Sequence, residues 1–209
     1  MLLLLLCDVA PPLNSSYRWL KDIQAIEQRD AATPPPNGAV FFCGSSSIVR
    51  WDLSASFPEW KTVKRGFGGS KIADSSFFAD RLVLPYEPSA IVFYAGDNDL
   101  AGGLTPEQVR DDFRAFVKIV RTRLPNVPIL FIAIKPSTAR WKWWDRIQKA
   151  NDLIRSDCDG KSVMVVDVVT PMLGRDGKPR RELLAKDGLH LSPAGYALWN
   201  TIVAQALKR

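Results

Sequence analysis

Short apolar stretches alternate with amphipathic stretches along most of the chain after the Pro-rich segment at residues 33–38. The apolar stretches are rich in Val, Ile and Phe and lack polar alternation, which is typical of strands buried on both faces of a parallel sheet. They occupy residues 39–43, 62–64, 90–95, 128–134 and 162–168, of which 62–64 gives the weakest pattern.

The segments between these stretches carry apolar residues at helical spacing. The clearest helix start is Thr105-Pro106-Glu107-Gln108, with Thr105 as N-cap, Pro106 in the first helical position and Gln108 completing a capping box. Further helices are predicted at residues 17–29, at residues 143–156 and from residue 192 toward the C-terminus.

The alternation of strands and helices predicts right-handed crossovers and a doubly wound α/β domain. We expect a three-layer α/β/α sandwich with a five-stranded, mostly parallel sheet. The expected division is an N-terminal segment with an amphipathic helix (1–36) and a second domain (37–209). In such folds a functional site lies at the carboxyl ends of the strands.

The composition is that of an ordinary globular protein, with 46% hydrophobic and 24% charged residues, which excludes wholesale disorder. The formal net charge of +6 is spread along the chain, and the Arg180-Arg181 pair is too short for a nucleic-acid-binding tract. We therefore interpret the charge as a solubility feature and expect no nucleic-acid partner.

The three cysteines are Cys7, Cys43 and Cys158. They have no metal-ligand spacing, and their odd number argues against a disulfide framework. With a single histidine in the chain, a zinc site is not expected either. Cys43 ends an apolar stretch and is predicted to be a small buried residue.

Residues 1–7 are five leucines between Met1 and Cys7. The stretch lacks a basic start, is short for an export signal and cannot span a bilayer. Leu6 also departs from the small residue that precedes a lipoprotein cysteine. We favour a shortened export signal, and hence an exported or periplasmic protein, over a cytoplasmic start.

Polar clusters follow the predicted strand ends, and the first two are rich in serine and glycine. Gly44-Ser45-Ser46-Ser47 follows the first strand; alone, this pattern is more typical of a turn with a helix cap than of a nucleophile. The second strand runs into Arg65-Gly66-Phe67-Gly68-Gly69-Ser70. Its glycines permit a tight turn or close approach of a ligand to the backbone, but their spacing does not fit a dinucleotide-binding loop.

The other two clusters carry acids, an amide and the only histidine. Gly96-Asp97-Asn98-Asp99 follows the third strand; it lacks the ligand series of a calcium loop, whereas an Asn amide can donate to an oxyanion. Asp187 stands three positions before His190, the only histidine. A carboxylate beside a histidine can make it the base that activates a serine, although the pair alone favours a surface histidine without a chemical role.

In this combination and order, the four clusters resemble the blocks of the SGNH (GDSL-type) serine esterases and lipases, which include platelet-activating-factor acetylhydrolase-like and lysophospholipase-like enzymes. The resemblance covers roughly residues 39–208 and implies the flavodoxin-like SGNH hydrolase fold. It implies a catalytic Ser46, Asp187 and His190, with Ser46, Gly69 and Asn98 forming the oxyanion hole.

One departure from the family pattern concerns the nucleophile. The usual Gly-Asp-Ser-Leu is replaced by Gly44-Ser45-Ser46-Ser47, so three adjacent serines compete and the register after the glycine selects Ser46. Gly66 and Gly68 remain alternatives to Gly69.

The resemblance implies hydrolysis of carboxylic esters through an acyl-serine, with a small-molecule ester as substrate and neither cofactor nor metal. The absence of a long apolar lid favours short acyl or acetyl groups. An acyltransferase using the same residues is the alternative within the family. A non-catalytic carbohydrate-binding module remains a further alternative because Trp141, Trp143 and Trp144 can stack on sugars or acyl chains, or can simply pack; a nucleotide-binding module is disfavoured by the glycine spacing.

Overall fold

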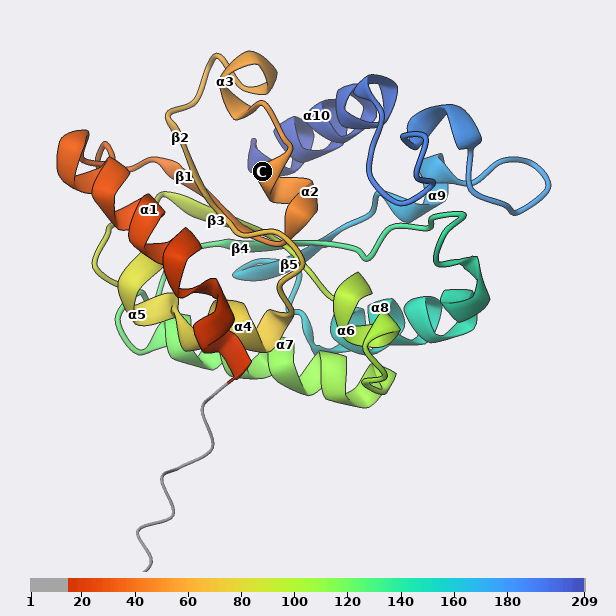
Figure 1. The fold of residues 1–209 in the computed structure, drawn as a ribbon, viewed down its shortest axis with the longest axis horizontal. Helices are drawn as coiled ribbons and strands as arrows, with labels where there is room; N and C mark the ends of the chain where they lie inside the picture. Colours follow the sequence, from red (N-terminus) through yellow and green to blue (C-terminus); the bar gives the residue numbers. More distant parts are fainter. Residues whose placement is uncertain (1–14, 209) are drawn as a thin grey trace, which may run out of the picture.

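The computed structural model describes residues 15–208 and has a five-stranded, entirely parallel sheet with the strand order β2-β1-β3-β4-β5. The strands are β1 (Val40–Gly44), β2 (Thr62–Gly66), β3 (Ala90–Tyr94), β4 (Ile129–Ile132) and β5 (Val163–Val166). Helices cover both faces of the sheet (Figure 1). The predicted three-layer α/β/α class is therefore confirmed.

The longer helices are α1 (Leu20–Ala32), α7 (Pro106–Arg121), α8 (Trp144–Asp157) and α10 (Pro193–Leu207). The short ones are η1 (Ser15–Trp19), α2 (Ser46–Val49), α3 (Leu53–Ser56), α4 (Ile72–Phe77), α5 (Ala79–Leu82), α6 (Asp97–Ala101), η2 (Trp141–Trp143), α9 (Val169–Met172) and η3 (Arg181–Leu183). All four long helices match predicted segments, and α7 begins with the predicted capping box of Thr105 and Gln108. The sequence did not predict the short ones, because one or two turns carry too little periodicity.

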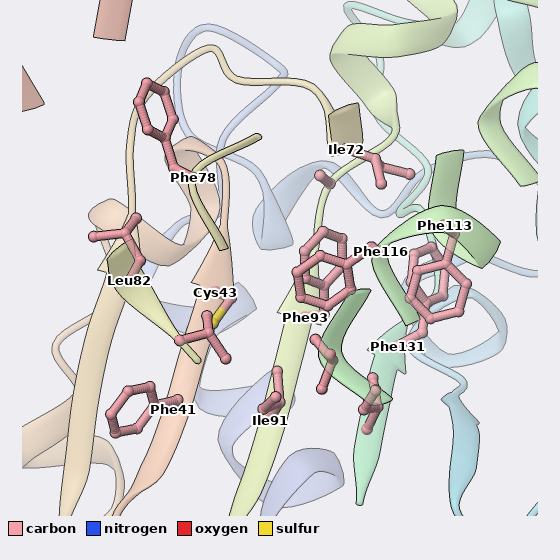
Figure 2. Close-up of a cluster of buried hydrophobic side chains, with 14 of the residues drawn as sticks. Phe41, Cys43, Ile72, Phe78, Leu82, Ile91, Phe93, Phe113, Phe116 and Phe131 are labelled. Atoms are coloured by element: carbon pink, nitrogen blue, oxygen red, sulfur yellow. The ribbon is translucent and has the colours of Figure 1, made fainter. Parts of the chain in front are cut away.

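Alternate side chains of each central strand enter opposite cores. Phe41, Phe93 and Phe131 face one core, whereas Phe42 and Tyr94 face the other. In the first core, Phe93 packs on Phe131 and on the phenylalanines of α7, as Figure 2 shows. This burial on both faces explains why the sequences of the central strands are continuous apolar stretches.

The helix α1 belongs to the first core, where Ile23 and Ile26 are buried. An ion pair also joins α1 to β2. Both guanidinium Nη atoms of buried Arg65 in β2 donate to the carboxylate of Asp30 in α1, over 3.0 and 2.7 Å. A bidentate pair of this kind satisfies a cation that would otherwise be costly to bury. Residues preceding the predicted hydrolase domain thus complete its core.

The carboxyl ends of three neighbouring strands, β2, β1 and β3, are level. Gly44, the last residue of β1, pairs in register with Gly66 of β2 and with Tyr94 of β3. The chain reverses its direction of winding between β1 and β3, which is where doubly wound sheets open a crevice for ligands. The polar clusters after β1, β2 and β3 therefore emerge at one edge.

Three further expectations concern the N-terminus, membrane-spanning segments and Cys43. The predicted export signal, with Cys7, lies outside the described residues. Within residues 15–208, the structure contains no helix with the length and apolar character needed to span a bilayer. Cys43 is buried as predicted, and burial raises the pKa of its thiol to about 12.

We predict that Gly44→Ala destabilises the protein by about 3 kcal/mol or more. Gly44 has φ +127°, and a Cβ there would stand 1.9 Å from the carbonyl oxygen of Tyr94. The matched control is Gly68→Ala, because a Cβ on Gly68 meets no atom within 4 Å and should change stability by less than about 1 kcal/mol. Urea denaturation measures both, and equal effects would contradict the steric account.

Candidate active site

A chain of hydrogen bonds links three of the predicted residues. Ser46 Oγ, at the first position of α2, lies 3.0 Å from His190 Nε2. His190 Nδ1 lies 2.6 Å from Asp187 Oδ2. This is the arrangement in which an imidazole can take a proton from a serine while a carboxylate holds the ring.

The structure distinguishes among the three adjacent serines by exposure. Ser45 and Ser47 are each only 1% exposed, whereas Ser46 is half-buried. The backbone of Ser47 is also anchored, because its carbonyl accepts a hydrogen bond from the Tyr196 hydroxyl over 2.9 Å. Only Ser46 combines access from solvent with contact to the histidine.

The loop that carries the acid and the histidine is organised by Asp187. Its Oδ1 accepts the backbone N–H groups of Leu189 and His190, each over 2.9 Å. The hydrogen bond with the His190 ring, joined by these two N–H groups, holds the pKa of Asp187 well below its usual range. Asp187 is therefore ionised at neutral pH, and because 45% of its side chain is exposed, little loss of hydration opposes the charge.

Two backbone N–H groups shortly after β1 and β2 are left without a partner among the described residues. Within residues 15–208, no hydrogen bond engages the backbone N–H of Ser46 or of Gly69. Gly69 has φ +76°, and a Cβ there would come within 3.2 Å of the Trp19 ring. Gly66 belongs to β2, and neither it nor Gly68 has a positive φ. Gly69 is thus the glycine of this cluster whose conformation requires glycine.

Asn98 lies at the start of α6 and has a side-chain amide that can donate hydrogen bonds. Its Nδ2 donates to the carbonyl of Ser70 over 3.1 Å, which ties the turn after β3 to the glycine loop after β2. Its Oδ1 accepts from Arg140 over 2.9 Å. All five residues predicted for the site are therefore brought to one edge of the sheet.

The comparison with family models gives a match over most of the chain. The model of the GDSL-like lipase/acylhydrolase family matches residues 41–198, a span that contains the complete candidate site. The chain belongs to the GDSL-like lipase/acylhydrolase family. It is accordingly a carboxylic ester hydrolase, and the predicted family and enzyme class are confirmed.

Solved structures with the same fold include other members of this class. A GDSL-like lipase from Bacteroides thetaiotaomicron has a TM-score of 0.77 at 19% identity, over 90% of this chain and 97% of that one. The lipase/acylhydrolase from Enterococcus faecalis has a TM-score of 0.64 at 19% identity, over 81% of this chain and 94% of that one. A carbohydrate esterase family 3 protein from Talaromyces cellulolyticus has a TM-score of 0.60 at 17% identity, over 81% of this chain and 97% of that one. A search of curated protein sequences found no match.

Several residues of this GDSL-type site were not predicted from the sequence. Arg140 donates to Asn98 and, over 2.6 Å, to the carbonyl of Asp97. Buried Lys135 lies 3.2 Å from the Asp97 carboxylate and 2.9 Å from the Tyr94 hydroxyl. Although burial opposes its charge, Lys135 and Arg140 keep the pKa of Asp97 below its usual range. A lysine directly after an entirely apolar strand is the one sequence signal that could have revealed this pair.

The three tryptophans after β4 are engaged in contacts within the protein. Trp141 and Trp144 stack with their ring centroids 5.1 Å apart, and Trp144 also packs on the first core. Trp143 carries Lys142 over its ring at 4.2 Å and Arg140 at 5.8 Å. Their contacts within the protein therefore favour packing over a free stacking platform for sugars.

Asp99 is a second buried acid of the turn after β3. Burial raises its pKa to about 7, although its Oδ1 accepts the backbone N–H of Ile72 over 3.0 Å, which acts in the opposite direction. An aspartate in an unfolded chain has a pKa of about 3.9. The folded protein therefore binds an extra proton between these two values, and its stability falls as the pH rises through this interval.

We predict that Asp99→Asn removes this loss of stability. Between pH 4 and pH 8, the wild type should lose up to roughly 4 kcal/mol relative to the variant, because the asparagine oxygen still accepts from Ile72 but carries no charge. Urea denaturation at several pH values gives the difference. The exposed Asp152→Asn of α8 is the control, and parallel pH curves for wild type and Asp99→Asn would refute the prediction.

Proposed function

We propose that this enzyme hydrolyses esters of short acyl groups, acetyl esters among them, through an acyl-Ser46 intermediate. The observation that carries the proposal is the 3.0 Å contact between Ser46 Oγ and His190 Nε2, continued by the 2.6 Å contact to Asp187. These distances are within the range for proton transfer from a nucleophile to a general base.

In the first step, Ser46 Oγ attacks the ester carbonyl carbon while His190 Nε2 takes the hydroxyl proton. Asp187 stabilises the resulting imidazolium and fixes the ring orientation. The carbonyl π electrons move to oxygen, giving a tetrahedral oxyanion. The N–H groups of Ser46 and Gly69 and the amide of Asn98 are the donors proposed to hold this charge.

Collapse of the tetrahedral intermediate breaks the bond to the leaving alcohol, which receives the proton from His190. Water then attacks the acyl-serine with His190 again acting as base. A second tetrahedral intermediate releases the acid and returns the proton to Ser46 Oγ. The cycle uses no cofactor or metal, so activity should persist in the presence of a chelator.

The surface supports short rather than long acyl groups. Among residues 15–208, Tyr17 and Val49 are the only large hydrophobic residues that expose 40% or more of their surface to solvent. A long acyl chain needs extensive apolar surface to leave water, at about 0.8 kcal/mol per methylene. The fold shared with a carbohydrate esterase makes acetylated sugars a reasonable class to include among the test substrates.

We predict that Ser46→Ala and His190→Ala each remove nearly all esterase activity, and that the double variant loses little more, because the residues act as a unit. Initial rates with p-nitrophenyl acetate measure this. Ser45→Ala and Ser47→Ala are the controls and should retain turnover. Activity in Ser46→Ala combined with its loss in either neighbour would overturn the assignment of the nucleophile.

We predict that kcat/KM for p-nitrophenyl esters is highest at acetate or butyrate and falls steadily toward palmitate. Initial rates of p-nitrophenol release give the ranking, and acetate release is measured for acetylated sugars, with Ser46→Ala reporting the background in both assays. Product analysis in the presence of an added alcohol separates hydrolysis from acyl transfer. A maximum at palmitate would refute the short-chain assignment.

A further inference from the structure

We propose that Arg140 is a positioning residue, which holds the amide of Asn98 in the one orientation that presents an N–H to the substrate oxyanion. The inference rests on the proposed function, because it concerns how the third oxyanion donor is kept in place. It is carried by the hydrogen bonds of Asn98 and of the Arg140 guanidinium.

The asparagine amide has two N–H donors and one carbonyl oxygen. One N–H donates to Ser70 O over 3.1 Å, and the oxygen accepts from Arg140 Nη2 over 2.9 Å. One N–H is left for a ligand. A flip of the amide would set its oxygen against the carbonyl of Ser70 and its NH₂ against the guanidinium, and would turn a lone pair toward the oxyanion. Arg140 therefore opposes the flipped state electrostatically.

Arg140 is itself fixed at a second point. Its Nη1 donates to the carbonyl of Asp97 over 2.6 Å, so the planar guanidinium bridges two consecutive residues of the turn. The Asp97 side chain is in turn held by buried Lys135, whose Nζ lies 3.2 Å from Asp97 Oδ2. A lysine at position 140 would present a single ammonium in place of this fork. The bridging therefore depends on the shape of arginine as well as on its charge.

The loop that carries Arg140 also supports the histidine. The Thr138 hydroxyl and the Ala139 N–H both donate to the carbonyl of Gly188, over 3.2 and 3.0 Å. Gly188 has φ +66°, and a Cβ there would stand 2.3 Å from Thr138 Oγ1. The loop after β4 thus contacts the Asp187–His190 loop through Thr138 and Ala139, and it contacts the turn that carries Asn98 through Arg140. A substitution of Arg140 can therefore remove the second contact and leave the first in place.

The test is a double-mutant cycle between Arg140→Met and Asn98→Ala, measured as kcat and KM on p-nitrophenyl acetate. Methionine keeps much of the side-chain bulk over Trp143 but has no donor. Removal of a complete oxyanion donor costs roughly 10²–10³ in turnover. We expect Arg140→Met to lower kcat by about 10- to 100-fold with KM changed less than about threefold. In the Asn98→Ala background, the same change should lower kcat by less than about threefold.

Two further variants complete the experiment. Arg140→Lys should restore part of the loss, and it supplies the cycle if the methionine variant does not fold. Arg146→Ala is the matched control, because Arg146 on the adjacent α8 also donates to backbone carbonyls, those of Gly103 and Leu104; its kcat should remain at the wild-type level.

Additive losses in the cycle, or a wild-type kcat in Arg140→Met, would overturn the positioning role. A rise in KM without a fall in kcat would instead make Arg140 a substrate-binding residue and would equally overturn it. Failure of the proposed function looks different, because Ser46→Ala would then keep its turnover whatever the result at Arg140.

Discussion

The level register at the end of β1 is the constraint on which the site depends. Gly44 pairs with Gly66 on one side and with Tyr94 on the other, so the chain leaves three neighbouring strands at the same height. Ser46, the glycine loop and the turn with Asn98 then meet without further long-range arrangement. Because Gly44 approaches the Tyr94 carbonyl closely, no side chain fits at this position, two residues before Ser46.

The loop with Asp187 and His190 comes from a distant part of the chain and is joined to this edge by the loop after β4. Thr138 and Ala139 bind the carbonyl of Gly188, two residues before His190. Arg140 binds the turn that carries Asn98. A single short segment therefore contacts both the loop that carries His190 and the turn that carries Asn98. The buried pair of Lys135 and Asp97 joins the start of this segment to the same turn.

The sequence was sufficient to predict the sheet and the residues that meet at its edge, for identifiable physical reasons. Strands buried on both faces are uniformly apolar, and the polar residues that follow them, such as Ser46 and Asn98, stand out at the strand ends. Arg140 was not predicted, because its partner Asn98 lies 42 positions away and nothing local distinguishes a bridging arginine from a solvated one. The position of Trp19 beside Gly69 was not predicted for the same reason, since only the tertiary fold brings the two residues together.

The central claim is that Ser46 is the nucleophile, and covalent labelling tests it most directly. The protein would be treated with a fluorophosphonate ester and digested, and the modified peptide fragmented finely enough to separate adjacent serines by mass spectrometry. We expect one adduct, on Ser46, which disappears in His190→Ala because the hydroxyl is no longer activated. An adduct on Ser45 or Ser47, or labelling of Ser46 that is independent of His190, would contradict it.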